Sequence, residues 1–473
     1  MPEWEPVIGL EIHVQLNTRT KMFCGCELSF GEEPNTRTCP TCLGLPGALP
    51  VTNEAAIHRG LMIGLALGSR LAERSVFHRK NYFYPDSPKA YQISQYDEPL
   101  CLGGSLGDVR IHRVHLEEDA AKLVHVGASG RIHGADASIV DFNRCGTPLV
   151  EIVTEPDVRS AEQAREFLTL LRVTLRQLGV SDVNMEEGSL RCDANISLRP
   201  AGSEALGTKT ELKNMNSFRF IERGINAEIA RQAAILDAGE AVEQETLHFD
   251  PRSERLTSLR SKEEAHDYRY FPEPDLVPIA ITAEMLDAAR AAMPELPAAR
   301  AERLEGLGVS ADSARLLAFR PELGDAFEAA LAAAPDGDGQ PSPLAQSLAN
   351  WLANEEAAAT VEPAALATLV AMAEAREVSR EGARQVLERL VSDPTHANPR
   401  AIVEAEGLAA VGGADELAPI VAAALEANPD VAEKLRGGDM KPIGVIVGHV
   451  MRETRGRADG GAVTRLVREQ LGL

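Results

Sequence analysis

Apolar and polar residues alternate along two segments of the first half of the chain. Residues 9–16 read Gly-Leu-Glu-Ile-His-Val-Gln-Leu, and residues 190–198 read Leu-Arg-Cys-Asp-Ala-Asn-Ile-Ser-Leu. Because successive side chains of a strand point to opposite faces, this period of two predicts strands with one buried face. Residues 160–178 instead repeat their apolar positions at helical spacing. Ser160 and Gln163 there fit a capping box, and Gly179 is suited to end the helix.

The pattern changes near residues 293–297, where Met-Pro-Glu-Leu-Pro ends the strand-rich part. Beyond it Ala, Leu and Glu recur at helical spacing, and Ser379 is placed to cap a helix. A second break, rich in Asp, Pro and Asn, falls at residues 393–399. We therefore predict an α+β protein with a mixed α/β head over residues 1–293, an all-helical domain over 294–398 and a small helical tail domain over 399–473.

Length and composition support several packed domains without a membrane segment. The chain has 473 residues, 44% of them hydrophobic, and no apolar run approaches the roughly 18 residues of a membrane helix. The first residues lack the basic and apolar stretches of a signal peptide, so a cytoplasmic location is expected. The net charge of −23 opposes general coating by nucleic acid, but Lys and Arg outnumber Asp and Glu over residues 431–473, where RNA could bind locally.

Four of the seven cysteines lie close together in the sequence, at Cys24, Cys26, Cys39 and Cys42. An odd number of cysteines without a signal peptide does not indicate a disulfide framework. Two closely spaced pairs supply the four thiolates of a tetrahedral zinc site, and four thiolates leave no open position for catalysis. The pattern therefore predicts a structural Zn²⁺ ion; the alternative is four buried free thiols in a loop-rich region.

Several acidic residues and one histidine occupy positions that suggest a cation site. Glu11 and His13 lie two apart on the first predicted strand and so point to the same side. Glu151 interrupts an apolar run, where charge is costly, and Asp193 lies on the polar side of the strand over residues 190–198. Oxygen ligands with one imidazole suit Mg²⁺, which also holds nucleotide phosphates. The alternative is a solvated strand face.

Basic residues flank these acidic positions and could neutralise phosphate during phosphoryl transfer. They are Lys80, Lys89, Arg144, Lys209 and Lys213. The chain has neither a G-x-x-x-x-G-K-[ST] phosphate-binding loop nor a G-x-G-x-x-G motif, so any ATP is expected in a sheet-lined cleft of another kind. No amidase-type nucleophile signature is present, so any ammonia release would take place on another chain.

Longer motifs in this chain resemble the B-subunit family of the tRNA-dependent amidotransferases. They begin with Gly-Leu-Glu-Ile-His at residues 9–13 and end with Val-Gly-His-Val-Met at residues 447–451, so the resemblance spans the chain. The matching segments in between are residues 79–86, 89–95, 115–119, 141–152, 187–195, 211–217 and 266–272.

The resemblance implies a cradle-shaped catalytic head that uses ATP and Mg²⁺ to phosphorylate the side-chain carboxylate of Glu on misacylated tRNA(Gln), or of Asp on tRNA(Asn). A partner amidase subunit would supply ammonia from glutamine, which makes the enzyme a carbon–nitrogen ligase. A small linker subunit would complete a heterotrimer, and the helical and tail domains would hold the tRNA. Which of the two tRNAs is the physiological substrate stays open.

The resemblance also implies a set of magnesium ligands. His13, Glu118, Glu151 and Asp193 would surround the ion, with Glu11 beside them. On a regular strand Glu117 and Glu118 point to opposite faces, and the family pattern favours Glu118. The rival interpretation is a non-catalytic, zinc-stabilised adaptor that binds tRNA and has a vestigial acidic cleft.

Overall fold

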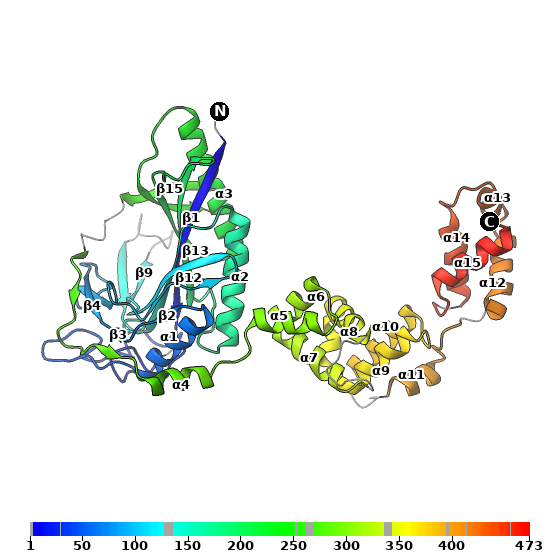
Figure 1. The fold of residues 1–473 in the computed structure, drawn as a ribbon, viewed down its shortest axis with the longest axis horizontal. Coiled ribbons are helices and arrows are strands. Elements are labelled where there is room, and N and C mark those ends of the chain that lie inside the picture. The colour runs from blue at the N-terminus through cyan, green and yellow to red at the C-terminus, as the bar shows by residue number, and fades with distance from the viewer. Residues whose placement is uncertain are drawn as a thin grey trace. The chain divides into compact units, whose positions relative to one another are not determined.

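The computed structural model describes residues 3–28, 30–126, 136–250, 253–261, 268–334, 343–393, 398–411, 414–454 and 456–473. Most of the predicted break at residues 393–399 and the first two residues of the 266–272 motif lie outside the described residues. The chain divides into two compact units, Met1–Leu296 and Pro297–Leu473 (Figure 1). The first unit mixes strands and helices and the second is helical, so the predicted α+β class is confirmed.

A large sheet forms the centre of the first unit. Its described strands follow the order β15-β14-β13-β12-β1-β11-β8-β6-β2, with β7 pairing with β8. Neighbouring strands are antiparallel, except that β13 and β14 are parallel. The strands are β1 (Trp4–Gln15), β2 (Arg70–Leu71), β6 (Cys101–Leu102), β7 (Ser105–Leu106), β8 (Val109–Glu118), β11 (Pro148–Thr154), β12 (Leu190–Pro200), β13 (Thr210–Met215), β14 (Glu245–Asp250) and β15 (Arg255–Ser261).

Helices supply the apolar core of this unit on one side of the sheet. The alternating apolar residues of β1 and β12 share one buried cluster with α1 (Glu54–Ala66), α2 (Ala161–Gln177) and α3 (Phe218–Asp237) (Figure 1). Helix α4 (Ala283–Ala291) packs against α1. The period of two in β1 and β12 therefore has the predicted consequence: the apolar side is buried, and the polar side is left for other contacts.

Helix α2 is the helix predicted over residues 160–178. The Ser160 hydroxyl accepts a hydrogen bond from the backbone N–H of Gln163 (3.1 Å). The Gln163 side chain accepts from the backbone N–H of Arg159 (2.8 Å), one residue earlier than a regular capping box. Gly179 follows the helix with φ +66°, a left-handed conformation that costs glycine little.

Three smaller sheets flank the large one. They pair β16 (Phe271–Pro272) with β4 (His78–Asn81) and β4 with β5 (Tyr91–Ser94), β9 (Lys122–Val126) with β10 (Ala137–Asp141), and β3 (Arg74–Ser75) with β17 (Ile279–Ala280). The Arg79 guanidinium donates two hydrogen bonds of 2.7 Å to the buried carboxylate of Glu273. This bidentate pair fixes the chain after β16 to β4, across a large separation in sequence.

Among its described residues, the second unit is built from helices, with two isolated β-bridges, Val378–Ala409 and Val411–Ala458, between the segments that connect them. The helical elements are α5 (Pro297–Gly306), α6 (Ala311–Phe319), α7 (Pro321–Ala332), α8 (Pro343–Asn354), the 3₁₀ turn at Glu356–Thr360, α9 (Pro363–Glu374), α10 (Arg380–Ser392), α11 (Pro399–Glu406), α12 (Ala414–Glu426), α13 (Pro429–Arg436), α14 (Ile443–Glu453) and α15 (Gly460–Leu471). Ser379 caps α10 as predicted, accepting from the backbone N–H of Gly382 (3.0 Å). The helices enclose two separate apolar cores, one before and one after residue 411. None of the described helices is long and apolar enough to cross a membrane.

Close packing of α1 on the sheet yields a stability prediction at Gly64. A Cβ atom there would lie 2.4 Å from Cys101 Sγ and 2.7 Å from Leu71 Cδ2. We expect Gly64→Ala to lower the free energy of unfolding by about 1–2 kcal/mol, because overpacking outweighs the helix propensity gained. Thermal or urea unfolding would measure it.

The exposed Ala55→Ser in the same helix is the control and should change stability by less than about 0.5 kcal/mol. A Gly64→Ala protein as stable as the parent would contradict the close approach of α1 to the sheet.

Candidate active site and cysteine cluster

The polar face of the central sheet gathers the acidic residues that the sequence analysis identified. The register of β1 pairs His13 with Glu151 on β11, and Glu11 with Asp193 on β12. Glu151 is in turn paired with His115 on β8. Because directly paired residues of antiparallel strands share a face, these side chains from four adjacent strands meet on one surface.

His13 lies at the centre of this group. Its Nε2 atom is 3.7 Å from Glu11 Oε1, 3.8 Å from Glu117 Oε1 and 3.6 Å from Glu151 Oε2. These separations exceed those of N–H···O hydrogen bonds and fall within the roughly 3–4 Å expected between ligand atoms on one Mg²⁺ ion. His13, Glu117 and Glu151 form one candidate cation group, and Glu11 and Asp193 form an adjoining one with the same histidine. One imidazole with several carboxylates is a donor set that fits Mg²⁺.

Burial and mutual attraction set the charges of this group. The side chains of Glu117 and Glu151 are only 2% and 6% exposed, so their charges need partners. Burial alone would raise the pKa of Glu151, but His115 and His13 hold it well below its usual range. Burial alone would lower the pKa of His13, but Glu151, Glu117 and Glu11 raise it to about 9. In the absence of a bound cation, His13 is therefore protonated at neutral pH, and a metal ion bound at this nitrogen would take the place of that proton.

His115 on β8 lies next to the two buried carboxylates, Glu117 and Glu151. Its Nε2 atom lies 3.2 Å from Glu151 Oε2 and 3.9 Å from Glu117 Oε2. Among the described residues, its buried Nδ1 atom has no hydrogen-bond partner. Burial opposes its protonation, but the two carboxylates raise the pKa of His115 above the usual value. His115 thus compensates charge and leaves Glu117 Oε1 directed at His13.

The adjoining group is balanced by Lys213 on β13. The Lys213 ammonium lies 2.7 Å from Asp193 Oδ2 and 3.4 Å from Glu211 Oε1. Glu11 is the most open member, with 28% of its side chain exposed. Repulsion from Glu151, together with burial, raises the pKa of Glu11. This end of the site therefore holds both a predicted phosphate-neutralising lysine and the most accessible carboxylate.

Glu118 does not join the His13 group. It follows Glu117 directly on β8 and therefore points to the opposite face of that strand. There its carboxylate forms an ion pair with Lys89 and accepts a hydrogen bond from the backbone N–H of Ile93 (3.0 Å). The structure brings Glu117, and not Glu118, to His13, contrary to the ligand set that the family pattern implied.

Lys80 also lies beside the His13 group. Burial would lower its pKa, but Tyr270, Glu117 and Glu151 together raise it above the usual value. Lys80 follows Arg79 on β4, so the two side chains point to opposite sides of that strand. The positive charge of Lys80 therefore offsets the negative charge of Glu117 and Glu151.

The remaining predicted basic residues have other surroundings. Lys89 pairs with Glu118 on the far side of β8. The Arg144 guanidinium donates to the backbone carbonyls of Ala120 (2.9 Å) and Ala121 (2.8 Å) and so supports the turn after β8. Lys209 is exposed in the segment just before β13. Lys89 and Arg144 are thus engaged with protein partners.

The four predicted zinc ligands come together. The sulfur atoms of Cys24, Cys26, Cys39 and Cys42 all lie within 4.8 Å of one another, which fits the roughly 3.8 Å spacing of four thiolates around one Zn²⁺. Lys21 is fully buried beside them, with its ammonium donating to the carbonyls at residues 37 (2.8 Å) and 142 (3.2 Å) and lying 3.7 Å from Cys42 Sγ. A hydrogen bond from Cys24, with help from Lys21, lowers the pKa of Cys42 to about 4.

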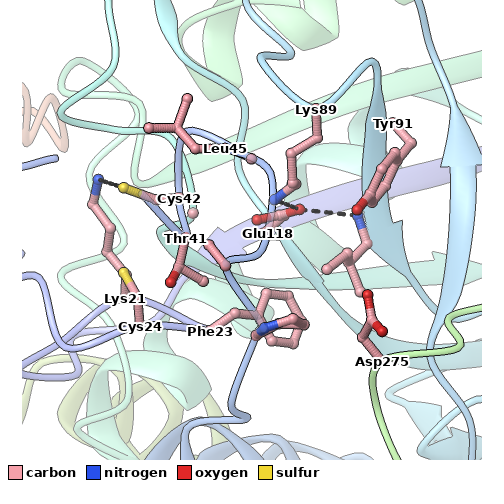
Figure 2. A pocket seen from close by; sticks show the side chains of 15 residues that line it. Lys21, Phe23, Cys24, Thr41, Cys42, Leu45, Lys89, Tyr91, Glu118 and Asp275 are labelled. Atoms are coloured by element: carbon pink, nitrogen blue, oxygen red, sulfur yellow. Dashed lines mark hydrogen bonds and ion pairs between the residues drawn. The ribbon is translucent and has the colours of Figure 1, made fainter. Parts of the chain in front are cut away.

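A cavity of about 150 Å³ is lined by Cys24 and Cys42 of the cysteine cluster and by the Lys89–Glu118 pair. Figure 2 shows the Lys89 and Glu118 side chains meeting on one side of it, while Lys21 contacts Cys42 on the other. Because Glu118 and Glu117 occupy opposite faces of β8, this cavity is separate from the His13 group.

Sequence reasoning did not single out His115 and Lys21. A signal for His115 was present, because it lies two residues before Glu117 and so shares its face of the strand. Lys21 carried no comparable signal, since its burial depends on carbonyl groups at residues 37 and 142.

Comparison with known proteins identifies the family. A family model described as the GatB/GatE catalytic domain matches residues 6–287, and one described as the GatB domain matches residues 325–471. The chain is 50% identical to the B subunit of the aspartyl/glutamyl-tRNA(Asn/Gln) amidotransferase of Frankia casuarinae, covering 100% of this chain and 97% of the relative.

Proteins with the same name in Anaeromyxobacter sp. (strain K) and Moorella thermoacetica are 49% and 47% identical. Each alignment covers 99% of this chain, and 99% and 100% of the respective relative. The resemblance found in the sequence motifs is confirmed: this chain belongs to the GatB/GatE family, as a B subunit of the aspartyl/glutamyl-tRNA amidotransferases.

Proposed function

We propose that this chain uses ATP to activate the side-chain carboxylate of Glu on misacylated tRNA(Gln), or of Asp on tRNA(Asn), for amidation. The observation that carries the proposal is the group of three carboxylates 3.6–3.8 Å from His13 Nε2, with Lys80 and Lys213 beside it. The relatives named above act, by their names, on aspartyl and glutamyl tRNAs.

The chemistry explains why the site consists of fixed charges. An oxygen of the substrate carboxylate would attack the γ-phosphorus of ATP, the bond to the β-phosphate oxygen would break, and ADP would leave. Because this nucleophile is already anionic, no general base is required. The main barrier is the repulsion between two anions, which positioned cations reduce.

Each charged residue then has a role in this step. His13, Glu117 and Glu151, with Glu11 and Asp193 adjoining, would hold Mg²⁺, which supplies charge neutralisation for the phosphates. Lys80 and Lys213 would bind phosphate oxygens from the two ends of the group. His115 would keep the buried carboxylates in position.

Amidation needs a second step and a partner. Ammonia, released from glutamine by a partner amidase subunit, would form a bond to the activated carbonyl carbon as phosphate leaves. We therefore place this chain in a heterotrimer with the amidase and a small linker subunit. Since the substrates are tRNAs, we place the complex in the cytoplasm.

The other parts of the chain are assigned structural and tRNA-binding roles. The cysteine cluster would hold a structural Zn²⁺, since four thiolates leave no position for substrate. We keep the three-domain division at residues 293 and 398, which the two separate apolar cores of the second unit support. The helical and tail domains would bind the tRNA.

Removal of the charge of Glu151, with the shape of the side chain kept, tests whether the subunit is catalytic. In the reconstituted heterotrimer with labelled ATP and Glu-tRNA, we expect Glu151→Gln to lower formation of the phosphorylated intermediate about 100-fold or more. Its affinity for tRNA, measured by filter binding, should stay nearly unchanged. Full activity, or an equal loss of tRNA binding, would favour the non-catalytic adaptor.

Two neighbouring variants on β8 serve as a matched pair for this experiment. Glu117→Gln should raise the Mg²⁺ concentration needed for half-maximal rate by about tenfold or more, because it removes a ligand. Glu118→Gln should leave that concentration unchanged, whatever its effect on rate. The reverse order would restore Glu118 as the ligand.

Metal analysis tests the cysteine cluster. Freshly purified protein should contain about one zinc per chain, and Cys39→Ser should lose the zinc together with thermal stability. Cys101→Ala, which changes a buried cysteine outside the cluster, is the control and should keep its zinc. A parent protein without zinc would support the free-thiol alternative.

The salt dependence of tRNA binding tests the tail. Arg452 on α14 and Arg465 on α15 are exposed. Changing both to Ala should weaken binding and reduce the slope of log affinity against log salt by about one for each phosphate that these side chains neutralise. Arg290→Ala, at an exposed position on α4, is the control. An unchanged slope would exclude these two residues as phosphate ligands.

A further inference from the structure

The tyrosines of this chain are concentrated in one place. All six occur within residues 82–96 and 268–270, in a chain that is only 4% aromatic. The three-stranded sheet joins these distant segments, because β16 pairs with β4 and β4 pairs with β5. The Tyr96 and Tyr270 rings stack with centroids 4.3 Å apart and an interplanar angle of 8°, and Tyr268 meets Tyr270 edge-on at 6.1 Å.

The segment that carries Tyr268 and Tyr270 is held firmly. The Asn81 amide donates to the backbone carbonyls of Tyr268 (3.0 Å) and Arg269 (2.9 Å), and the Arg79–Glu273 pair fixes the chain just beyond. Arg269, between the two tyrosines, has φ +45°. A left-handed conformation is unfavourable for arginine and persists only where surrounding contacts impose it, as at binding sites.

These rings adjoin the acidic group on the central sheet. The Lys80 ammonium lies 4.9 Å from the centre of the Tyr268 ring. Burial, with Glu117 and Glu151 nearby, raises the pKa of Tyr270 to about 12, although Lys80 acts against this. Lys80 therefore interacts both with the Tyr268 ring and with the carboxylates of Glu117 and Glu151.

The stack is also open to solvent at one end. Tyr96 is 40% exposed, although Tyr270 covers one face of its ring. A stack made only for the core would bury its outer ring. An exposed aromatic ring next to a phosphate-handling site is instead the arrangement by which proteins bind nucleobases, because every base has a π-face.

We propose that Tyr96, supported by Tyr270 and Tyr268, is a stacking platform for an adenine base whose ribose and phosphate extend past Lys80 toward the His13 group. This inference rests on the proposed function, which brings two adenines to the site. One belongs to ATP, and the other is the terminal adenosine of the tRNA that carries the amino acid. Both share the chemistry of an adenine joined through ribose to phosphate, and the experiment distinguishes them.

Steady-state kinetics of the reconstituted heterotrimer test the platform. We expect Tyr96→Leu to raise the KM of one substrate, either ATP or Glu-tRNA, by about tenfold, with kcat little changed, because stacking binds without taking part in the chemistry. The substrate whose KM rises identifies the base. Tyr270→Leu, which removes the supporting ring, should raise the same KM as Tyr96→Leu.

Tyr84→Leu is the matched control, because Tyr84 is 38% exposed and pairs with Tyr82 instead of the Lys80 group. Parental KM values for both substrates in Tyr96→Leu, or an equal rise in Tyr84→Leu, would overturn the platform. If the parent heterotrimer itself forms no phosphorylated intermediate, the proposed function fails first; parental activity with insensitive variants refutes the platform alone.

A fluorescent variant gives a readout that does not depend on turnover. In Tyr96→Trp, the indole should be quenched by ADP or by tRNA ending in adenosine, according to which base stacks there. The parent heterotrimer, in which this chain contributes Trp4 and Trp351, gives the background quenching that Tyr96→Trp should exceed. Absence of quenching by either ligand at concentrations that saturate the parent would overturn the proposal.

Discussion

Strand β1 lies between β11 and β12, and the register of these two antiparallel pairings determines both the core and the site. Leu10, Ile12 and Val14 are at most 1% exposed on the side covered by the helices. The intervening Glu11 and His13 necessarily point to the other side. A slip of one residue would bury these polar groups and expose the apolar ones. The hydrophobic effect that secures this register therefore also brings the carboxylates of four strands to His13.

Assembling these carboxylates creates an electrostatic cost that cations on β1, β8 and β4 offset. Glu117 and Glu151 are buried, and the structure surrounds them with His13, His115 and Lys80. Because these cations project from paired strands, they would need little rearrangement to receive a phosphate or a metal ion. Such fixed charges stabilise a developing charge more effectively than mobile ones, since the cost of ordering them is met during folding. This is the property that a phosphoryl-transfer site requires.

The sequence predicted what is local and could not predict what depends on pairing. A period of two placed Glu11 beside His13 and Asp193 on the polar side of β12. Helical spacing and Ser160 located α2. The sequence could not decide whether Glu117 or Glu118 faces His13. Alternation shows that the two side chains point to opposite faces of β8, but it does not show which face is shared with His13.

The pairing of β8 with β11 settles that choice, since it aligns His115 with Glu151 and so turns Glu117 to the same side. Burial of Lys21 and the meeting of Tyr96 with Tyr270 likewise depend on segments far apart in sequence. Family resemblance supplied the motif and favoured Glu118, whereas the structure turns Glu117 toward His13.

Three adjacent acids at the end of β8 have three different surroundings: Glu117 faces His13, Glu118 pairs with Lys89, and Asp119 binds Gln15 (2.6 Å) and Arg191 (2.9 Å). The Asp119 contacts tie the end of β8 to β1 and β12, and the Glu118 contact ties it to the segment before β5. The contacts of Glu118 and Asp119 thus fix the position of Glu117. The charges of this acidic run therefore contribute to the geometry of the site as well as to its chemistry.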